Sequence, residues 1–184
     1  FKASNLDHRP DLVVVGNVIR AVYDEAQALL DSDLVYCSFP QLLGAMFLED
    51  TRSLVLAGTH GKTTCTAIAT WLLDAAGRAP GYLVGGVAAN FDRTARACKA
   101  APGVPRHFVI EGDEYDTAFF DKQPKFVHDR PRTAILTSVE FDHADIYRDL
   151  DHVKQAFRRF VSLIPEDDGC LVACWQHDNV REVV

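Results

Sequence analysis

The sequence has 184 residues, of which 48% are hydrophobic and 24% are charged, and its formal net charge is −7. These values are typical of a globular protein with enough chain to bury a substantial core. The sequence has neither a basic run nor an apolar run near the roughly 20 residues of a membrane helix, so it disfavours nucleic acid as the main partner and a membrane-spanning fold.

The first quarter of the chain alternates short apolar runs with alanine- and leucine-rich segments, which is an α/β pattern. The alternation stops before it completes a sheet, as if the sequence had been cut from something longer. We expect residues 1–40 to be the carboxyl-terminal part of one domain and residues 41–184 to form a second domain. The elements predicted in the first part are a buried strand at 12–15, a helix at 22–31, a strand at 34–36 and a helix at 41–48.

A second α/β unit starts with the apolar run "LVLA" at residues 54–57. A buried parallel strand needs no polar alternation, because both of its faces are covered. A helix is predicted to follow and to end at Gly77. The residues expected to share the buried face of this helix are Cys65, Ile68, Ala69, Leu72, Leu73 and Ala76.

Four more strands and one more helix are predicted in the rest of the chain. The segments are a strand at 82–84 with a Gly85-Gly86 turn, a loop at 88–105, strands at 107–110, 133–139 and 170–174, and an irregular segment between Pro124 and Pro131. Asp149 is expected to cap the helix. Its predicted apolar face is Leu150, Val153, Phe157, Phe160, Val161 and Ile164, and its polar face is Asp151, Lys154, Arg158 and Arg159. Together these elements predict an α/β fold of the P-loop type, with a mostly parallel sheet flanked by helices.

The five cysteines form an odd set with no C-x-x-C pair. We expect them to be buried small side chains in a reducing compartment, rather than metal ligands or disulfides. The amino end has no apolar stretch of the signal-peptide kind, so the expected location is the cytoplasm. The cysteines are Cys37, Cys65, Cys98, Cys170 and Cys174.

The motif G-T-H-G-K-T-T lies between the strand at 54–57 and its helix. Two glycines let backbone amides point inward and the helix N-terminus adds partial positive charge, so an anion is the expected ligand. Lys62 is expected to reach the β- and γ-phosphates of a nucleotide, and the Thr63 hydroxyl a magnesium ion. The longer phosphate-loop pattern would have a glycine at position 56, where this chain has Leu56. The expected nucleotide-binding residues are Gly58, Thr59, His60, Gly61, Lys62, Thr63 and Thr64.

Two further strands are followed by acidic clusters, "IEGDEYD" and "VEFDHAD". Ligands of open parallel sheets bind outside the carboxyl ends of the strands, so these clusters should meet the glycine-rich turn. Mg²⁺ on a triphosphate usually needs only one or two carboxylates, and Glu111 fits that role beside Thr63. His143, flanked by Asp142 and Asp145, is a candidate ligand of a second metal, with a carboxylate fixing its tautomer. The alternative is an ordinary packed or exposed histidine.

The three motifs together resemble the ATP-binding central domain of the Mur ligases, the cytoplasmic amide-forming enzymes of peptidoglycan synthesis. The resemblance implies ATP and Mg²⁺ as cofactors, with Lys62, Glu111 and His143 as catalytic residues. It implies that Lys62 contacts the β- and γ-phosphates, that Thr63 and Glu111 hold one magnesium ion, and that His143 holds a second. It also implies that Asn90, in "GGVAANF", contacts the uridine-linked substrate.

The wording "EGDEYDTAFFDKQPKFVHDRPRTAIL" followed by "EFDHADIY" resembles one branch of the family. That branch joins UDP-N-acetylmuramate to the tripeptide L-Ala-γ-D-Glu-meso-diaminopimelate through an acyl phosphate, in peptidoglycan recycling. The alternatives are the branch that adds L-alanine to UDP-N-acetylmuramate, and an ATP-binding module without ligase chemistry.

The chain departs from the family pattern at two positions. Several relatives carry a carbamylated lysine on the helix after the histidine, but the corresponding position falls near Arg158. Ser138 stands where relatives commonly have asparagine, which leaves the local hydrogen bonding open. The family has three domains, so the resemblance also leads us to expect that the carboxyl-terminal domain is absent here and that this fragment is inactive alone.

Overall fold

The computed structural model describes residues 1–99, 103 and 105–184. Its main feature is a six-stranded sheet with the strand order β10-β9-β3-β6-β4-β5. All neighbouring strands are parallel except β4 and β5, which are antiparallel. The strands are β3 (Arg52–Ala57), β4 (Gly81–Leu83), β5 (Ala95–Arg96), β6 (His107–Gly112), β9 (Thr133–Leu136) and β10 (Cys170–Ala173). The expected fold, a mostly parallel sheet flanked by helices, is confirmed.

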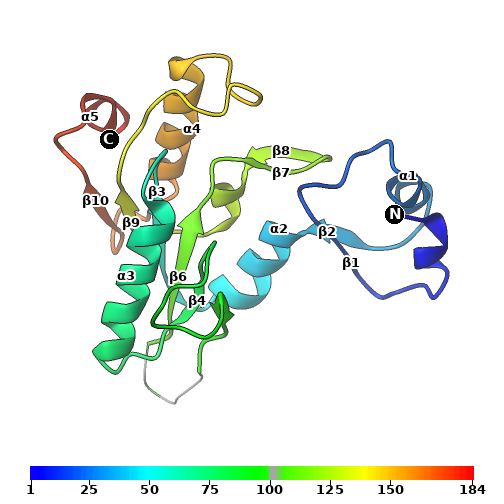
Figure 1. Cartoon of the computed structure of the whole chain (residues 1–184), viewed down its shortest axis with the longest axis horizontal. Helices are drawn as coiled ribbons and strands as arrows, with labels where there is room; N and C mark the ends of the chain where they lie inside the picture. Colours follow the sequence, from blue (N-terminus) through cyan, green and yellow to red (C-terminus); the bar gives the residue numbers. More distant parts are fainter. Residues whose placement is uncertain (100–102, 104) are drawn as a thin grey trace.

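A smaller first unit lies apart from this sheet and joins it through α2 (Phe39–Leu43) (Figure 1). Its two strands are parallel to each other and form a separate sheet. The elements of this unit are η1 (Ala3–Leu6), β1 (Val13–Val15), α1 (Asp24–Leu30) and β2 (Tyr36–Ser38), and η2 (Gly44–Leu48) continues α2. The predicted elements at 12–48 are all present with shifted ends, while the exact domain boundary stays a prediction.

Helices cover both faces of the large sheet. The helix α3 (Lys62–Ala75) packs on one face, where Leu56, Tyr82 and Val109 are buried. The other face packs against α4 (Leu150–Ser162) and α5 (Asp178–Val183), through Phe157, Phe160, Val180 and Val183. Alternate residues of each central strand therefore point into different cores, as the continuous apolar runs predicted.

The predicted buried face of α3 is partly wrong. Cys65, Ala69 and Leu73 do pack on the sheet, but Ile68 and Leu72 are more than half exposed. Thr66 and Thr70 are buried instead. Each threonine hydroxyl donates to the backbone carbonyl four residues earlier, so the buried oxygens are satisfied and the helix can turn this stripe toward the strands. Gly77, at φ 72°, ends the helix as expected.

The structure also differs from the predictions after β6. The chain forms a hairpin of β7 (Asp116–Ala118) and β8 (Asp121–Pro124), and the segment predicted to be irregular contains the short helix η3 (Lys125–His128). Strand β9 ends at Leu136, three residues earlier than predicted, because residues 137–140 turn away to contact the glycine-rich turn.

Helix α4 has the predicted cap, since the Asp149 side chain accepts from His152 N at 2.8 Å. Lys154, predicted on the polar face of α4, is buried because α5 lies over it. Its Nζ donates to Glu182 Oε2 of α5 at 2.8 Å.

The loop predicted at 88–105 contains the short strand β5, and its residues 100–102 and 104 lie outside the described part of the chain. The five cysteines are free thiols; Cys170 is exposed and the other four are half-buried, so the expectation of full burial is wrong. In the described residues, no helix is both long and apolar enough to cross a bilayer.

Candidate active site

The turn between β3 and α3 has the backbone conformation that its two glycines allow. Gly58 has φ 135° and Gly61 has φ 82°, in the region that residues with a side chain rarely adopt. A Cβ on Gly58 would lie 2.9 Å from the backbone nitrogen of Ser138 and would overlap Thr137 Oγ1. The turn therefore needs glycine at position 58 for both its dihedral angles and its close approach to the segment after β9.

Hydrogen bonds hold the glycine-rich turn against that segment. Thr59 N donates to Ser138 O at 3.0 Å, His60 N donates to Ser138 Oγ at 3.0 Å, and Glu140 N donates to Thr59 Oγ1 at 2.9 Å. The hydrogen bonding left open for Ser138 is thus satisfied. Of the expected nucleotide-binding residues, Thr59 is buried, while His60 and Thr64 are exposed beside the helix N-terminus.

The Lys62 ammonium group contacts both its own turn and a buried carboxylate. Its Nζ donates to Gly58 O at 2.7 Å and to Glu114 Oε1 at 2.9 Å, and it lies 2.8 Å from Glu114 Oε2. The Lys62 side chain is 16% exposed and that of Glu114 only 2%. Lys62 therefore lies at the edge of the protein interior, where the opposite charge of Glu114 compensates its burial.

Thr63 and Glu111 lie together, as predicted. The Thr63 hydroxyl donates to Glu111 Oε2 at 2.9 Å, and Gly85 N donates to Glu111 Oε1 at 2.5 Å. The pairing of β3 with β6 brings them together, with Leu56 opposite Glu111. In residues 1–99, 103 and 105–184, no group of three His, Cys, Asp or Glu side chains has the geometry of a metal site. A hydroxyl and one carboxylate still fit Mg²⁺, which takes its remaining ligands from phosphate and water.

His143 belongs to the same rim, and the carboxylate nearest to its ring is neither of the two that flank it in the sequence. Its Nε2 lies 3.2 Å from Glu114 Oε1, and its Nδ1 lies 2.5 Å from the Tyr115 hydroxyl. The carboxylate of the flanking Asp142 lies farther away, at 3.8 Å from Nδ1. His143 has φ 58°, so the backbone is held in a left-handed turn that directs the ring to this position. Both ring nitrogens are engaged, so a metal ion on His143 would replace one of these contacts.

Two tyrosines support this part of the rim. Burial, with nearby carboxylates such as that of Asp145, raises the pKa of Tyr115, so its hydroxyl stays protonated beside His143 at neutral pH. The Tyr147 hydroxyl donates to the backbone carbonyl of Glu114 at 2.7 Å. Burial also raises the pKa of Tyr147, which keeps it a hydrogen-bond donor.

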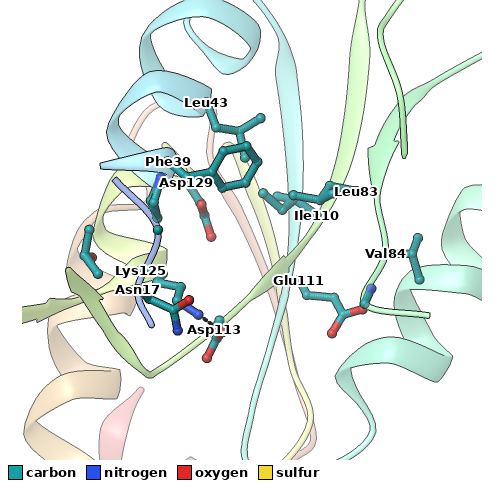
Figure 2. A pocket seen from close by; sticks show the side chains of 14 residues that line it. Asn17, Phe39, Leu43, Leu83, Val84, Ile110, Glu111, Asp113, Lys125 and Asp129 are labelled. Atoms are coloured by element: carbon teal, nitrogen blue, oxygen red, sulfur yellow. Dashed lines mark hydrogen bonds and ion pairs between the residues drawn. The ribbon is translucent and has the colours of Figure 1, made fainter. Parts of the chain in front are cut away.

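A cavity of about 370 Å³ opens beside Glu111, between α2 and the sheet (Figure 2). Its apolar side is formed by Phe39 and Leu43 from α2, facing Leu83 and Ile110 from β4 and β6. Its polar side chains are Asn17, Glu111, Asp113, Thr117, Lys125 and Asp129. The cavity has an apolar wall and a polar floor, a combination suited to an organic ligand with polar groups.

Three charged side chains of the cavity lie in different environments. Lys125 and Asp113 form an ion pair at 2.6 Å. Asp129 is buried, and in the described structure its Oδ2 has no hydrogen-bond partner. Burial, and secondarily the charge of Asp113, raises the pKa of Asp129 well above its usual value.

Asn90 is the predicted site residue that lies apart from this rim. It lines a shallow cavity with Ile68, Trp71 and Phe91, on the outer side of α3. The described contacts do not join it to Lys62, Glu111 or His143. Its assignment to a substrate stays a prediction.

Residues 56–183 match the family model described as the Mur ligase middle domain. Among the similar curated proteins is the UDP-N-acetylmuramate–L-alanyl-γ-D-glutamyl-meso-2,6-diaminoheptandioate ligase of Escherichia coli K12, which is 46% identical over 90% of this chain and 35% of its own length. The UDP-N-acetylmuramate–L-alanine ligase of Renibacterium salmoninarum is 38% identical over 92% of this chain and 33% of its own length. The chain thus spans about a third of these relatives.

The solved structures agree with this match. A crystal structure of UDP-N-acetylmuramate:L-alanyl-γ-D-glutamyl-meso-diaminopimelate ligase from Neisseria meningitides superposes with a TM-score of 0.93 at 44% identity, covering 100% of this chain and 58% of that one. The family model, the sheet order and the glycine-rich turn lead to one conclusion: the chain belongs to the Mur ligase family.

Proposed function

We propose that this chain is the ATP-binding part of a cytoplasmic ligase that joins UDP-N-acetylmuramate to L-Ala-γ-D-Glu-meso-diaminopimelate. The reaction is amide formation through an acyl phosphate, and it serves peptidoglycan recycling. The observation that carries the proposal is the convergence of Lys62, Thr63, Glu111 and His143 on one rim of the sheet. A triphosphate and a carboxylate repel each other, so a site that brings them together needs several cationic groups at one place.

Each residue of the rim has a proposed role. The amides at the N-terminus of α3 and the Lys62 ammonium group bind the β- and γ-phosphates. Thr63 and Glu111 hold Mg²⁺, which screens the phosphate charge when bound. His143 holds a second divalent ion near the substrate carboxylate, and Asn90 contacts the uridine-linked substrate.

The tripeptide is the favoured amine substrate because the relatives with this activity in their names are the more similar ones. The ligase from Escherichia coli is 46% identical to this chain, whereas the L-alanine ligase from Renibacterium salmoninarum is 38% identical. The L-alanine ligase activity is therefore the second candidate.

The test gives the full-length protein ATP, Mg²⁺ and UDP-N-acetylmuramate with either the tripeptide or free L-alanine, and measures phosphate release and product mass. We expect phosphate release with the tripeptide and none with L-alanine. Release with L-alanine alone would move the assignment to the second candidate.

A nucleotide-binding module without ligase chemistry is separated from both by a His143→Ala substitution. A ligase should keep much of its ATP affinity and lose turnover, because His143 is proposed to act on the carboxylate side. Unchanged turnover in this variant would contradict the role of His143.

A further inference from the structure

Glu114 is a buried carboxylate that lies between two of the proposed catalytic side chains. Its Oε1 lies 2.9 Å from Lys62 Nζ and 3.2 Å from His143 Nε2. Its Oε2 lies 2.8 Å from Lys62 Nζ, but in the described structure it receives no well-aligned hydrogen bond. The contact between Lys62 Nζ and Glu114 Oε2 is therefore an attraction between charges and not a directed hydrogen bond. Tyr147, which donates to the Glu114 carbonyl at 2.7 Å, fixes the backbone here.

The contacts of Lys62 leave little capacity for a further anion. An ammonium group has three donors. Here Nζ donates to Gly58 O at 2.7 Å, to Glu114 at 2.9 Å and, more weakly, to Thr59 O at 3.4 Å. A phosphate that reaches Lys62 must therefore replace at least one of these contacts. Glu114 is its competitor for the ammonium group, because both carry negative charge.

We propose that Glu114 is a positioning residue that competes with nucleotide phosphate for Lys62 and holds the His143 ring in its working orientation. The inference rests on the proposed function. Its buried negative charge also repels phosphates through a medium that screens poorly, which weakens nucleotide binding further. When Lys62 turns to phosphate, the Glu114 carboxylate keeps His143 Nε2 as its remaining side-chain partner, so nucleotide binding strengthens the hold on that ring.

The proposal predicts opposite effects on binding and turnover when the charge is removed. In Glu114→Gln, Lys62 loses its competing partner, so a non-hydrolysable ATP analogue with Mg²⁺ should bind at least about threefold more tightly. The His143 ring loses its charged partner, so kcat should fall at least about tenfold. A residue that only supports the fold would not tighten nucleotide binding.

The experiment uses the full-length protein, calorimetric titration with the ATP analogue and Mg²⁺, and steady-state kinetics of the ligase reaction. Glu114→Asp keeps the charge, so it should bind the analogue like the wild type and recover part of the lost kcat. The matched control is Asp116→Asn, because Asp116 is an acidic residue two positions away that pairs with Lys122 at the surface. It should change neither quantity by more than about twofold.

The outcomes are distinguishable. Unchanged or weaker analogue binding in Glu114→Gln, or an unchanged kcat, overturns the role of Glu114. A wild-type protein that does not bind the analogue overturns the proposed function instead. Thermal unfolding shows whether the Glu114→Gln variant is folded. If it is misfolded, the Glu114→Asp variant is the test, because its side chain is shorter. A kcat equal to that of the wild type in Glu114→Asp also overturns the proposal.

Discussion

Replacing Gly58 by alanine should destabilise the protein strongly, for two reasons that can be measured separately. The first is the dihedral angle, since φ 135° is unfavourable for a residue with a Cβ and costs about 1–3 kcal/mol. The second is steric, because the Cβ would overlap Thr137 Oγ1 and lie 2.9 and 3.0 Å from Ser138 N and O. Such overpacking costs about 1–3 kcal/mol. Together the expected loss is about 2–6 kcal/mol.

Gly61→Ala is the control that separates the two contributions. Gly61 also has a positive φ, of 82°, but no described atom lies within 4 Å of its added Cβ. This variant should lose only the dihedral part, about 1–2 kcal/mol. The assay is urea unfolding followed by circular dichroism, with all variants compared at one pH. If Gly58→Ala lost no more stability than Gly61→Ala, the steric explanation would be refuted.

The remaining predictions concern the buried interior. Asp129→Asn should stabilise the protein by about 1–3 kcal/mol at neutral pH, because it removes the cost of a buried, unpaired carboxylate. Burial raises the pKa of the Asp129 carboxyl, so the stability of the wild type is fully present below the usual carboxyl pKa and is lost as pH rises through the raised pKa. The stability difference between Asp129→Asn and the wild type should therefore vanish near pH 3. A difference that stays constant with pH would contradict this explanation. Phe157→Ala should cost about 3–5 kcal/mol in urea unfolding, since this ring is fully buried against Phe126. The exposed Trp175→Ala should cost under about 0.5 kcal/mol, and similar losses in both would contradict the core assignment.

The central strands could be predicted because both of their faces are buried. Residues 54–57 and 108–110 are continuous apolar runs, and no other element type suits such short runs between turn signals. The hairpin of β7 and β8 was missed because its strands are short, lie outside the main sheet and carry mixed polar residues. The buried and exposed faces of the helices were harder to predict. Lys154, for example, is buried only because α5, farther along the chain, lies over it.

The site could be predicted as far as residue type and strand position determine it. Thr63 and Glu111 meet because parallel strands end at one edge of the sheet, a rule that needs no coordinates. The partners of His143 could not be derived this way, because Glu114 and Tyr115 lie beyond the end of β6, where the strand period no longer says which way a side chain points. Glu114 had one signal, its place in the acidic cluster after that strand.

The hydrogen bonds between the glycine-rich turn and the segment after β9 have a consequence for engineering. Thr59 and His60 depend on Ser138 and Glu140, which lie in the segment that follows a different strand, β9. A transplant of the seven-residue motif alone into a new scaffold would lack these supports and should lose its shape. The transferable unit is a pair of segments, so a designer would have to move both strand ends together, at their mutual spacing.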